Sequence, residues 1–375
     1  MMDGSVTQRP SLKGFAYQPV ARHGVEVWQG NTADRLSPII SPDYLYDPAG
    51  PGVPHPDGYD EFGWLHQDRR LVTPKPALVK LSNVSVLRRS LGRNRYHIVL
   101  DEGVCARDSY HDGRWLGPHI GETVRLGLDG GPELTVNIMD DAPLEARVKH
   151  PCVLASHFWA ENYAHTLLET ASRFWPIEAH PEIADYPVIW DTPNRWQKEV
   201  AEWLAPGRVK PMPHNHMLFD TLYVPSFGIS RASVRWLRKR FGAPAEPGKR
   251  RLYITRADAT ERRVTNEEEV LAVLARHGFE TIMLTGMTVA EQRDLFREAE
   301  CVVMPHGAGC ANMIFAPESA KFIEFSPKSY QHSMFGHIAK WSGQWFGRIV
   351  CDDGKNKDMH VDTTVLSCAI EATGI

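Results

Sequence analysis

The second half of the chain alternates short apolar runs with stretches in which apolar residues recur at the spacing of a helix. The runs predict strands over residues 251–256, 280–284, 301–304 and 322–325, and the intervening patterns predict helices over residues 266–277 and 288–298. Such strict alternation is typical of a parallel, doubly wound sheet. In sheets of this kind ligands bind at the carboxyl ends of the strands, so polar residues at those ends are the first candidates for a site.

The third predicted strand ends in the turn Pro305-His306-Gly307-Ala308-Gly309, which leads into a new helical pattern. Glycine lets the backbone approach a ligand closely, and the free N–H groups and positive end of a following helix attract a diphosphate without a metal. A pair of glycines is weak support alone, because strand-to-helix turns also use glycine for geometry. The turn is therefore a candidate phosphate site, and the support for phosphate binding depends on the residues around it.

Charged and polar residues stand at or near the ends of three predicted strands. Arg256 ends the first strand, His306 follows the third, and Glu324 lies in the apolar run of the fourth. Because the carboxyl ends of parallel strands share one edge, these residues outline a pocket. Arg256 and one of Arg262 and Arg263 can make forked contacts with phosphate oxygens. His306 either donates to phosphate or stabilises the loop, and Glu324 is placed to accept ribose hydroxyls.

The first half of the chain offers a second set of polar residues on a helix predicted over residues 157–175. Glu161, His165 and Glu169 follow one another at intervals of four, and Asn162 precedes His165 by three. Residues at these spacings share one face of a helix, and the opposite stripe is apolar. A polar face is often only a solvated one, so two interpretations stay open: a solvated surface, or the lining of a site.

The pattern of prolines and glycines divides the chain into segments. Residues 37–63 hold six prolines, which exclude a continuous helix or central strand and predict an irregular arm. A β-rich start precedes an α/β core, and residues 242–248 are a short Pro/Gly-rich linker. We predict an arm over 1–76, a first domain over 77–242 and a second domain over 249–375.

The remaining patterns fill in these domains. The β-rich start has strand-like runs over residues 84–87, 96–100 and 134–138. The rest of the first domain has predicted strands over 186–190 and 221–224 and predicted helices over 195–204 and 233–241. The second domain continues with a predicted helix over 330–341, an apolar run over 345–350 and a predicted helix over 363–373.

Several motifs together carry a resemblance to a known family. They are Tyr253-Ile254-Thr255-Arg256, the pair Arg262/Arg263 followed by Asn266-Glu267, the Pro-His-Gly-Ala-Gly turn at 305–309, Phe322-Ile323-Glu324-Phe325, and the block from Asn162 to Glu169. As an ordered set over roughly residues 77–350 they resemble glycosyltransferase family 61. In the block from Asn162 to Glu169, Ala164 and Thr166 stand where the family usually has aromatic residues.

The resemblance implies an α/β fold of the GT-B type, with two Rossmann-like domains and a facing cleft, a nucleotide-sugar donor, inversion at the anomeric carbon and no essential metal or other cofactor. Donor contacts would come from Arg256, Arg262, Arg263, His306, Gly307, Ala308, Gly309, Asn312 and Glu324. Attack by an acceptor hydroxyl needs a base within about 3 Å. Glu169 or His165 could be that base, with Glu161 as a weaker third candidate and Asn162 on the acceptor side.

Composition excludes several other functions. The net charge of −4 gives no basic footprint for nucleic acid. The N-terminus has no apolar core of a signal peptide, and no stretch approaches the roughly 20 apolar residues of a membrane helix. We expect a protein of the cytoplasm, or one bound peripherally at the inner membrane. Its expected partners are a nucleotide-sugar donor, which the family resemblance implies to be a UDP-sugar, and a saccharide or glycolipid acceptor. A homodimer is one option.

Some features point elsewhere. Asp140 and Asp141 resemble the acidic metal motif of GT-A transferases, although a turn and a helix cap before residues 142–148 is the more ordinary interpretation. Two histidines at 214 and 216 lack a third ligand nearby. Cys310 is not expected to be a nucleophile, because inversion needs no covalent intermediate. Two alternatives to a transferase remain: a nucleotide-sugar epimerase or hydrolase, and a non-catalytic nucleotide-sugar-binding protein.

Overall fold

The computed structural model describes residues 145–375, apart from 157–160, 179, 193, 215, 226–228, 230 and 333, together with short strand segments nearer the N-terminus. Those segments cover residues 15–16, 18–19, 26–28, 78–90, 94–99, 106–107 and 135–136. The predicted arm over 37–63 lies outside the described residues. The chain divides into two compact units, with the boundary between Ala232 and Ser233. No helix in the described part has the length and apolarity needed to cross a bilayer.

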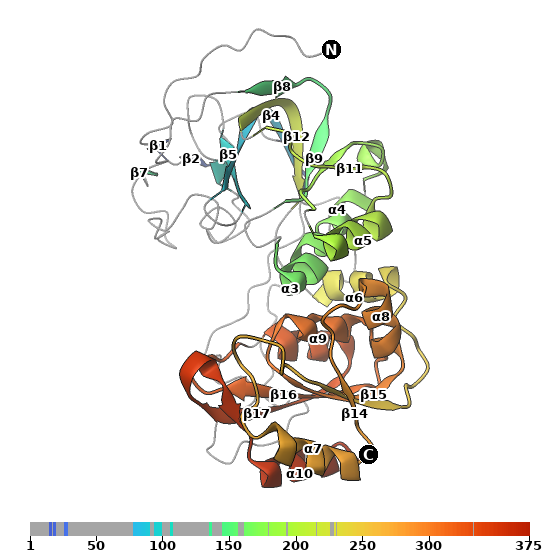
Figure 1. Cartoon of the computed structure of the whole chain (residues 1–375). Helices are drawn as coiled ribbons and strands as arrows, with labels where there is room; N and C mark the ends of the chain where they lie inside the picture. Colours follow the sequence, from blue (N-terminus) through green and yellow to red (C-terminus); the bar gives the residue numbers. More distant parts are fainter. Residues whose placement is uncertain are drawn as a thin grey trace. The chain divides into compact units, whose positions relative to one another are not determined.

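The second unit contains the predicted parallel sheet. Its strands are β13 (Arg250–Ile254), β14 (Glu280–Ile282), β15 (Ala299–Pro305), β16 (Lys321–Pro327), β17 (Trp345–Asp353) and the short β18 (Met359–His360). They lie in the order β14-β13-β15-β16-β17-β18, and all neighbours are parallel except β17 and β18. The prediction of a doubly wound parallel sheet is therefore confirmed for this unit (Figure 1).

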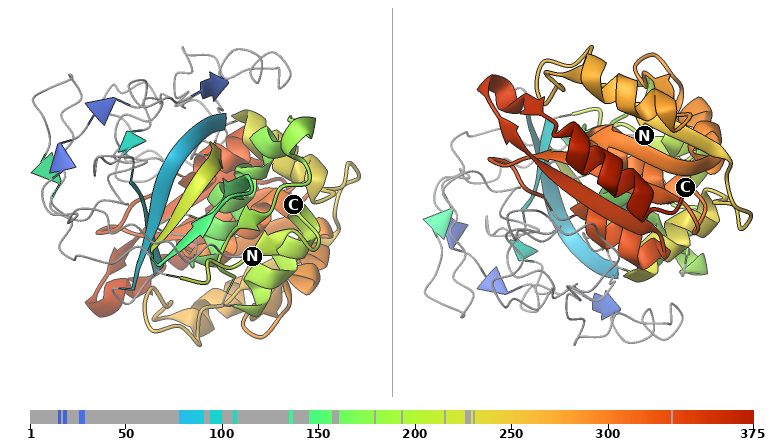
Figure 2. Two further views of the ribbon diagram at one scale, coloured as in Figure 1. Left: turned by 90° about the horizontal axis from the view of Figure 1, so that it is seen from above. Right: turned by 90° about the horizontal axis from the view of Figure 1, so that it is seen from below.

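Helices cover both faces of this sheet. On one face lie α7 (Glu267–Arg276) and α10 (Thr363–Ala372), whose apolar side chains share a core with Tyr253, Ile323 and Ile349 (Figure 2, right). On the other face lie α8 (Val289–Arg297), the 3₁₀ helix η6 (Ala308–Phe315) and α9 (Met334–Ser342) (Figure 1). Because successive strand residues point to opposite faces, Glu324 lies on the face opposite to Ile323.

The strand order reverses between β13 and β15, which are neighbours although β14 lies between them in sequence. Chains leaving these two strands turn in opposite directions, and the crevice between them is the usual ligand site of a doubly wound sheet. Arg256 follows β13 and His306 follows β15 directly. The fold therefore places two of the predicted site residues at the position where a nucleotide would be expected.

The boundary between the units falls within the first turn of helix α6 (Arg231–Arg240), whereas the Pro/Gly-rich segment 242–248 predicted it after that helix. The reason is that α6 and the segment pack on the second unit. Arg238 Nη1 donates to the carbonyl of Ala316 at 2.9 Å. A Cβ on Gly248 would lie 2.3 Å from the carbonyl oxygen of Ala299, so this backbone is held tightly against the sheet.

The first unit has a mixed sheet. The parallel part comprises β9 (Cys152–Leu154), β10 (Val188–Ile189) and β11 (Val209–Lys210); β12 (His216–Pro225) runs parallel to β9 and to β8 (Ala146–Val148), and antiparallel to β4 (Leu78–Ser90). β5 (Asn94–Val99) and β3 (Glu26–Trp28) pair with β4, while β1 (Phe15–Ala16) pairs with β7 (Thr135–Val136) and β2 (Gln18–Pro19) with β6 (Ala106–Arg107).

Two expectations for this unit need correction. The β-rich start is not a separate element, because β4 pairs with β12 along its length and so extends the α/β sheet. The helix expected over residues 142–148 is also wrong for 146–148, which form β8 beside β12. Both corrections have one cause: β12 offers a long edge whose pairing outweighs local propensity.

The helices that the structure describes in the first unit are α3 (Tyr163–His165), the π-helix η4 (Thr166–Thr170), α4 (Phe174–Glu178), η5 (Pro181–Ile183) and α5 (Arg195–Leu204). The single helix predicted over 157–175 is thus interrupted. Its first part begins only after Asn162, and a π turn replaces the α geometry at Thr166.

Candidate functional site

The centre of the candidate site is the contact between Arg256 and the turn that follows β15. A Cβ added to Gly307 would lie 2.3 Å from Nη1 of Arg256, so a side chain at this position would displace the guanidinium. Gly309 likewise leaves room for Leu284, whose Cδ1 would be 2.8 Å from an added Cβ. Both glycines are therefore explained by close packing, and at Gly307 the packed group is a cation.

Arg262 brings a second guanidinium to this place. Its Nη2 lies 2.6 Å from Glu261 Oε1, and its side chain is 17% exposed. Burial lowers the pKa of Arg256 and repulsion from Arg262 lowers it further, while the neighbouring carboxylates Glu261 and Asp258 offset this only in part. Within the described residues Nε of Arg256 has no hydrogen-bond partner. Two partly buried guanidiniums that lie close together are suited to bind an anion.

Arg263 is turned to a different partner. Its Nε and Nη2 donate to Asp358 Oδ2 at 3.1 and 2.7 Å, and its backbone N–H donates to Asp358 Oδ1 at 2.9 Å. This forked pair ties the loop after β13 to the chain before β18. The sequence left open which of the two arginines belongs to the site, and the geometry favours Arg262.

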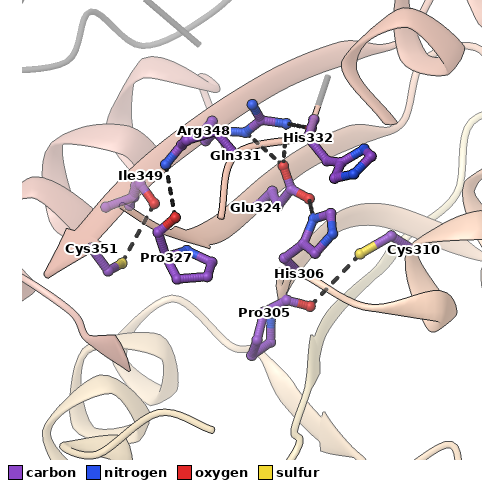
Figure 3. A network of polar contacts seen from close by, with 10 residues as sticks. All are labelled: Pro305, His306, Cys310, Glu324, Pro327, Gln331, His332, Arg348, Ile349 and Cys351. Atoms are coloured by element: carbon purple, nitrogen blue, oxygen red, sulfur yellow. Dashed lines mark hydrogen bonds and ion pairs between the residues drawn. The ribbon is translucent and has the colours of Figure 1, made fainter. Parts of the chain in front are cut away.

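His306, Glu324 and Arg348 form a buried chain of polar contacts (Figure 3). His306 Nδ1 lies 2.6 Å from Glu324 Oε1, and Arg348 Nε donates to Glu324 Oε2 at 2.7 Å. Glu324 lies inside β16 rather than at its end, opposite Arg348 of β17. Burial alone would raise the pKa of Glu324, but Arg348 and His306 hold it below its ordinary value.

An ionised Glu324 can only accept hydrogen bonds, so the proton between it and His306 belongs to the histidine Nδ1. The carboxylate thereby fixes the orientation of the ring at the end of β15. Both oxygens of Glu324 are already bound, and a ribose hydroxyl would have to compete for them. Contact between Glu324 and ribose therefore stays a prediction, while its bond to His306 is a feature of the structure.

Arg348 was missed by the sequence analysis. A signal was present, because this arginine interrupts the apolar run over 345–350 just as Glu324 interrupts the run over 322–325. Two opposite charges in apolar strands that are neighbours in a parallel sheet are expected to pair, since an unpaired buried charge is costly.

The helical pattern predicted after the glycine turn is a 3₁₀ helix, η6. Ala308 and Gly309 form its first turn, where N–H groups have no partner within a helix. Asn312 is fully buried and donates to Gln292 Oε1 at 2.8 Å, which joins η6 to α8. Cys310 is also buried, and burial raises the pKa of its thiol, which agrees with its exclusion as a nucleophile.

The first unit holds its candidate residues at the start of the interrupted helix. Asn162 is the N-cap, and its Oδ1 accepts from the backbone N–H of Ala164 at 2.9 Å and of His165 at 3.4 Å. Glu161 precedes this cap, so the prediction that it shares a helical face with His165 is wrong. A cap residue orders the first turn, and Asn162 therefore helps to position His165.

His165 and Glu169 do share a face, as predicted. His165 Nδ1 lies 2.5 Å from Glu169 Oε2, and the two side chains are 24% and 12% exposed. The π turn between them is closed by the N–H of Ala171 donating to the carbonyl of Thr166. The opposite stripe, with Leu167, Leu168 and Ala171, is buried. Single π turns occur often at functional sites, and this one carries a histidine and a carboxylate able to exchange a proton.

The metal candidates gain little support. Asp140 and Asp141 lie outside the described residues. His214 Nδ1 is 3.3 Å from Glu145 Oε2, which gives this histidine a carboxylate partner. The described part of the chain contains no group of three or more His, Cys, Asp and Glu residues arranged to hold a metal ion.

Comparison with known proteins identifies a family for the middle of the chain. Residues 163–323 match the family model described as Glycosyltransferase 61. No curated protein matches the chain. The matched range begins at the turn that carries His165 and Glu169 and includes Arg256, Arg262 and the glycine turn; Glu324 and Arg348 follow it. The resemblance seen in the motifs is confirmed over residues 163–323, which match glycosyltransferase family 61.

Proposed function

We propose that this glycosyltransferase moves a sugar from a nucleoside-diphosphate sugar, a UDP-sugar being the favoured donor, to a saccharide hydroxyl with inversion at the anomeric carbon. The observation that carries the proposal is the pair of guanidiniums, Arg256 and Arg262, beside Gly307 at the point where the strand order reverses. This is the place in a doubly wound sheet where the phosphates of a nucleotide bind.

The donor contacts follow from this arrangement. Arg256 and Arg262 stabilise the negative charge that develops on the leaving diphosphate as its bond to the sugar breaks. The N–H groups of Ala308 and Gly309 add dipoles at the same turn. His306, held by Glu324 and Arg348, presents the rest of its ring to the donor. We assign Arg262 rather than Arg263 to this set, because Arg263 is bound to Asp358.

The acceptor chemistry is assigned to the first unit. In a single displacement the acceptor oxygen bonds to the anomeric carbon while the bond to the diphosphate breaks, and the hydroxyl proton passes to a base. We favour Glu169 as this base, with His165 as its partner, because a carboxylate does not become cationic beside the positive charge that develops on the sugar. The alternative is that His165 takes the proton and Glu169 orients and stabilises the ring.

The finer parts of the proposal rest on the family. They are the GT-B arrangement, catalysis without a metal, a saccharide or glycolipid acceptor, and a role in bacterial surface polysaccharide synthesis. Two arginines and a helix start can balance a diphosphate without a metal ion, which supports the second point.

The test is a donor screen followed by a transfer assay. Thermal shift over UDP-, GDP-, CMP- and TDP-sugars should show one preferred nucleoside diphosphate, and that donor should be consumed faster when saccharide acceptors are added. Consumption that is independent of acceptor would favour a hydrolase, and conversion of the donor sugar to an isomer would favour an epimerase. Donor binding without consumption under any condition would favour a binding protein.

A further inference from the structure

A cluster of side chains around Tyr330 adjoins the candidate donor site. Lys357 Nζ lies 3.9 Å from the centre of the Tyr330 ring, and the guanidinium carbon of Arg262 lies 5.5 Å from the same centre. The Tyr330 ring in turn packs edge to face with His306 at 5.5 Å between centres. Tyr330 therefore connects His306 and Arg262 with a third cation, Lys357, for which the sequence gave no signal.

The backbone around these cations is strained. Arg262, Asn356 and Lys357 are the non-glycine residues at positive φ in the described chain, at 57°, 60° and 57°. They lie in two loops joined by a hydrogen bond from Arg262 N–H to the carbonyl of Asn356 at 3.0 Å. Such conformations persist only where the surroundings enforce them, and they cluster at ligand clamps. All three residues lie in the two loops that follow β13 and β17.

Other contacts hold the two loops together. The N–H of Met359 donates to the carbonyl of Arg263 at 2.7 Å, and the N–H of Thr265 donates to the carbonyl of Met359 at 2.8 Å. The forked pair of Arg263 with Asp358 adds to these bonds. Lys357 is thus presented from a fixed turn, η7 (Lys355–Lys357), rather than from a loose loop.

The charges in this cluster do not balance. Three cations, Arg256, Arg262 and Lys357, face the carboxylates Glu261 and Asp258, while Asp358 is already bound by Arg263. A cation over a partly exposed aromatic ring such as Tyr330 gains less than one that meets a phosphate oxygen. The cluster therefore has positive charge left over for a ligand with more than one phosphate group.

We propose that Lys357 is a third donor-binding cation, which makes the site selective for nucleoside diphosphates over nucleoside monophosphates. This inference rests on the proposed function. Arg256 and Arg262 can bind one phosphate group by forked contacts, and the second phosphate group requires the additional charge that η7 supplies.

The inference is tested by calorimetry with UDP, GDP and TDP and with the matching monophosphates, on wild type, Lys357→Ala and Lys355→Ala. Lys355 is exposed in the same turn and serves as the matched control. For the diphosphate that wild type binds best, Lys357→Ala should lose about tenfold in affinity, equal to about 1.4 kcal/mol. Affinity for the monophosphate should change less than twofold, and Lys355→Ala should bind both as wild type does.

A charge-conserving variant, Lys357→Arg, should keep most of the preference for the diphosphate. Wild-type affinity of Lys357→Ala for the diphosphate would overturn the inference, and so would an equal loss for mono- and diphosphate, which would mean that Lys357 only supports the loops. If wild type itself binds none of the nucleotides, the proposed function fails together with this inference. That result differs from failure of the inference alone, in which wild type still binds.

Discussion

Two histidine–glutamate pairs with nearly equal geometry occur in the two units, and their surroundings differ. The Nδ1 to carboxylate distance is 2.5 Å in His165–Glu169 and 2.6 Å in His306–Glu324. The side chains of the first pair are 24% and 12% exposed, whereas those of the second are 7% and 2% exposed. Among the residues that the structure describes, a buried arginine, Arg348, also binds the second carboxylate.

The difference shows that the same two side chains can serve opposite purposes. A carboxylate fixed in its ionised form by Arg348 holds its histidine in one orientation and gains no proton. A partly exposed pair without such an arginine can accept a proton and release it to solvent, as a catalytic base must. The first pair is therefore the better candidate for proton transfer, and the second for positioning.

The largest expected effect concerns turnover at the first pair. Glu169→Gln should lower turnover by about 10²–10⁴-fold while nucleotide affinity stays close to wild type, because the base is used only in the reaction. Comparing it with His165→Asn decides which residue is the base, and the matched variant of the second pair, Glu324→Gln, should lose mainly stability. Near wild-type transfer by both first-pair variants would make this helix only structural.

The second pair should govern stability. Glu324→Gln leaves Arg348 buried without a counter-charge, which should cost about 3–5 kcal/mol in the free energy of unfolding measured with urea. The double variant Glu324→Gln/Arg348→Met removes both charges and should recover part of the loss. A single variant within about 1 kcal/mol of wild type would show that the buried network contributes little.

The comparison can be sharpened at the cation beside the second pair. Arg256→Ala should weaken nucleotide binding by about 1.5–3 kcal/mol in calorimetry, because a charge-assisted phosphate contact is lost. Arg251→Ala, at the opposite end of β13, is the control and should bind as wild type does. Arg262→Ala should also weaken binding; a larger loss from Arg263→Ala than from Arg262→Ala would reverse the assignment of these two residues.

A smaller effect is expected from acid. Burial opposes ionisation of Glu324, but Arg348 and His306 hold its pKa below the ordinary 4.5. Because the folded state favours the ionised form, the stability from this carboxylate is present above pH 4.5 and lost as pH falls through the lower folded pKa. Urea unfolding of wild type should weaken across this acid range, and Glu324→Gln should show a flatter profile there.

The smallest effect is expected from removing metal ions, since neither pair is proposed to use one. Transfer should persist in excess EDTA because arginines balance the diphosphate. Complete loss that Mn²⁺ or Mg²⁺ restores would instead point to Asp140 and Asp141 and would count against the assignment of both pairs.

The sequence predicted the second unit well because its signals are local. The strands of the parallel sheet are separate apolar runs, and Arg256 and His306 mark the ends of two of them, so both residues could be placed at one edge before any coordinates. The resemblance to glycosyltransferase family 61 followed partly from the same motifs. The pairing of Glu324 with Arg348 was within reach, had the charge inside the last apolar run been used.

Other features depend on contacts that no local pattern reveals. The extension of the first sheet by β4 depends on β12, far along the chain. No particular residue type marks the π turn after His165, so the sequence could not predict it. Glu161 lies outside the helical face because the helix begins only after its N-cap, Asn162. The cluster at Tyr330 depends on non-glycine residues at positive φ, which propensities disfavour.

The pairing of β4 with β12 also has a consequence for how the first unit folds. Partners such as Leu87 and His216 are separated by roughly 130 residues, so this contact closes a long loop and slows folding. During synthesis the β4–β5 hairpin leaves the ribosome well before β12 exists, with one edge of β4 unpaired along nearly its whole length. An unpaired edge of this kind invites pairing with another chain. Nascent chains that end before β12 should therefore be the aggregation-prone species.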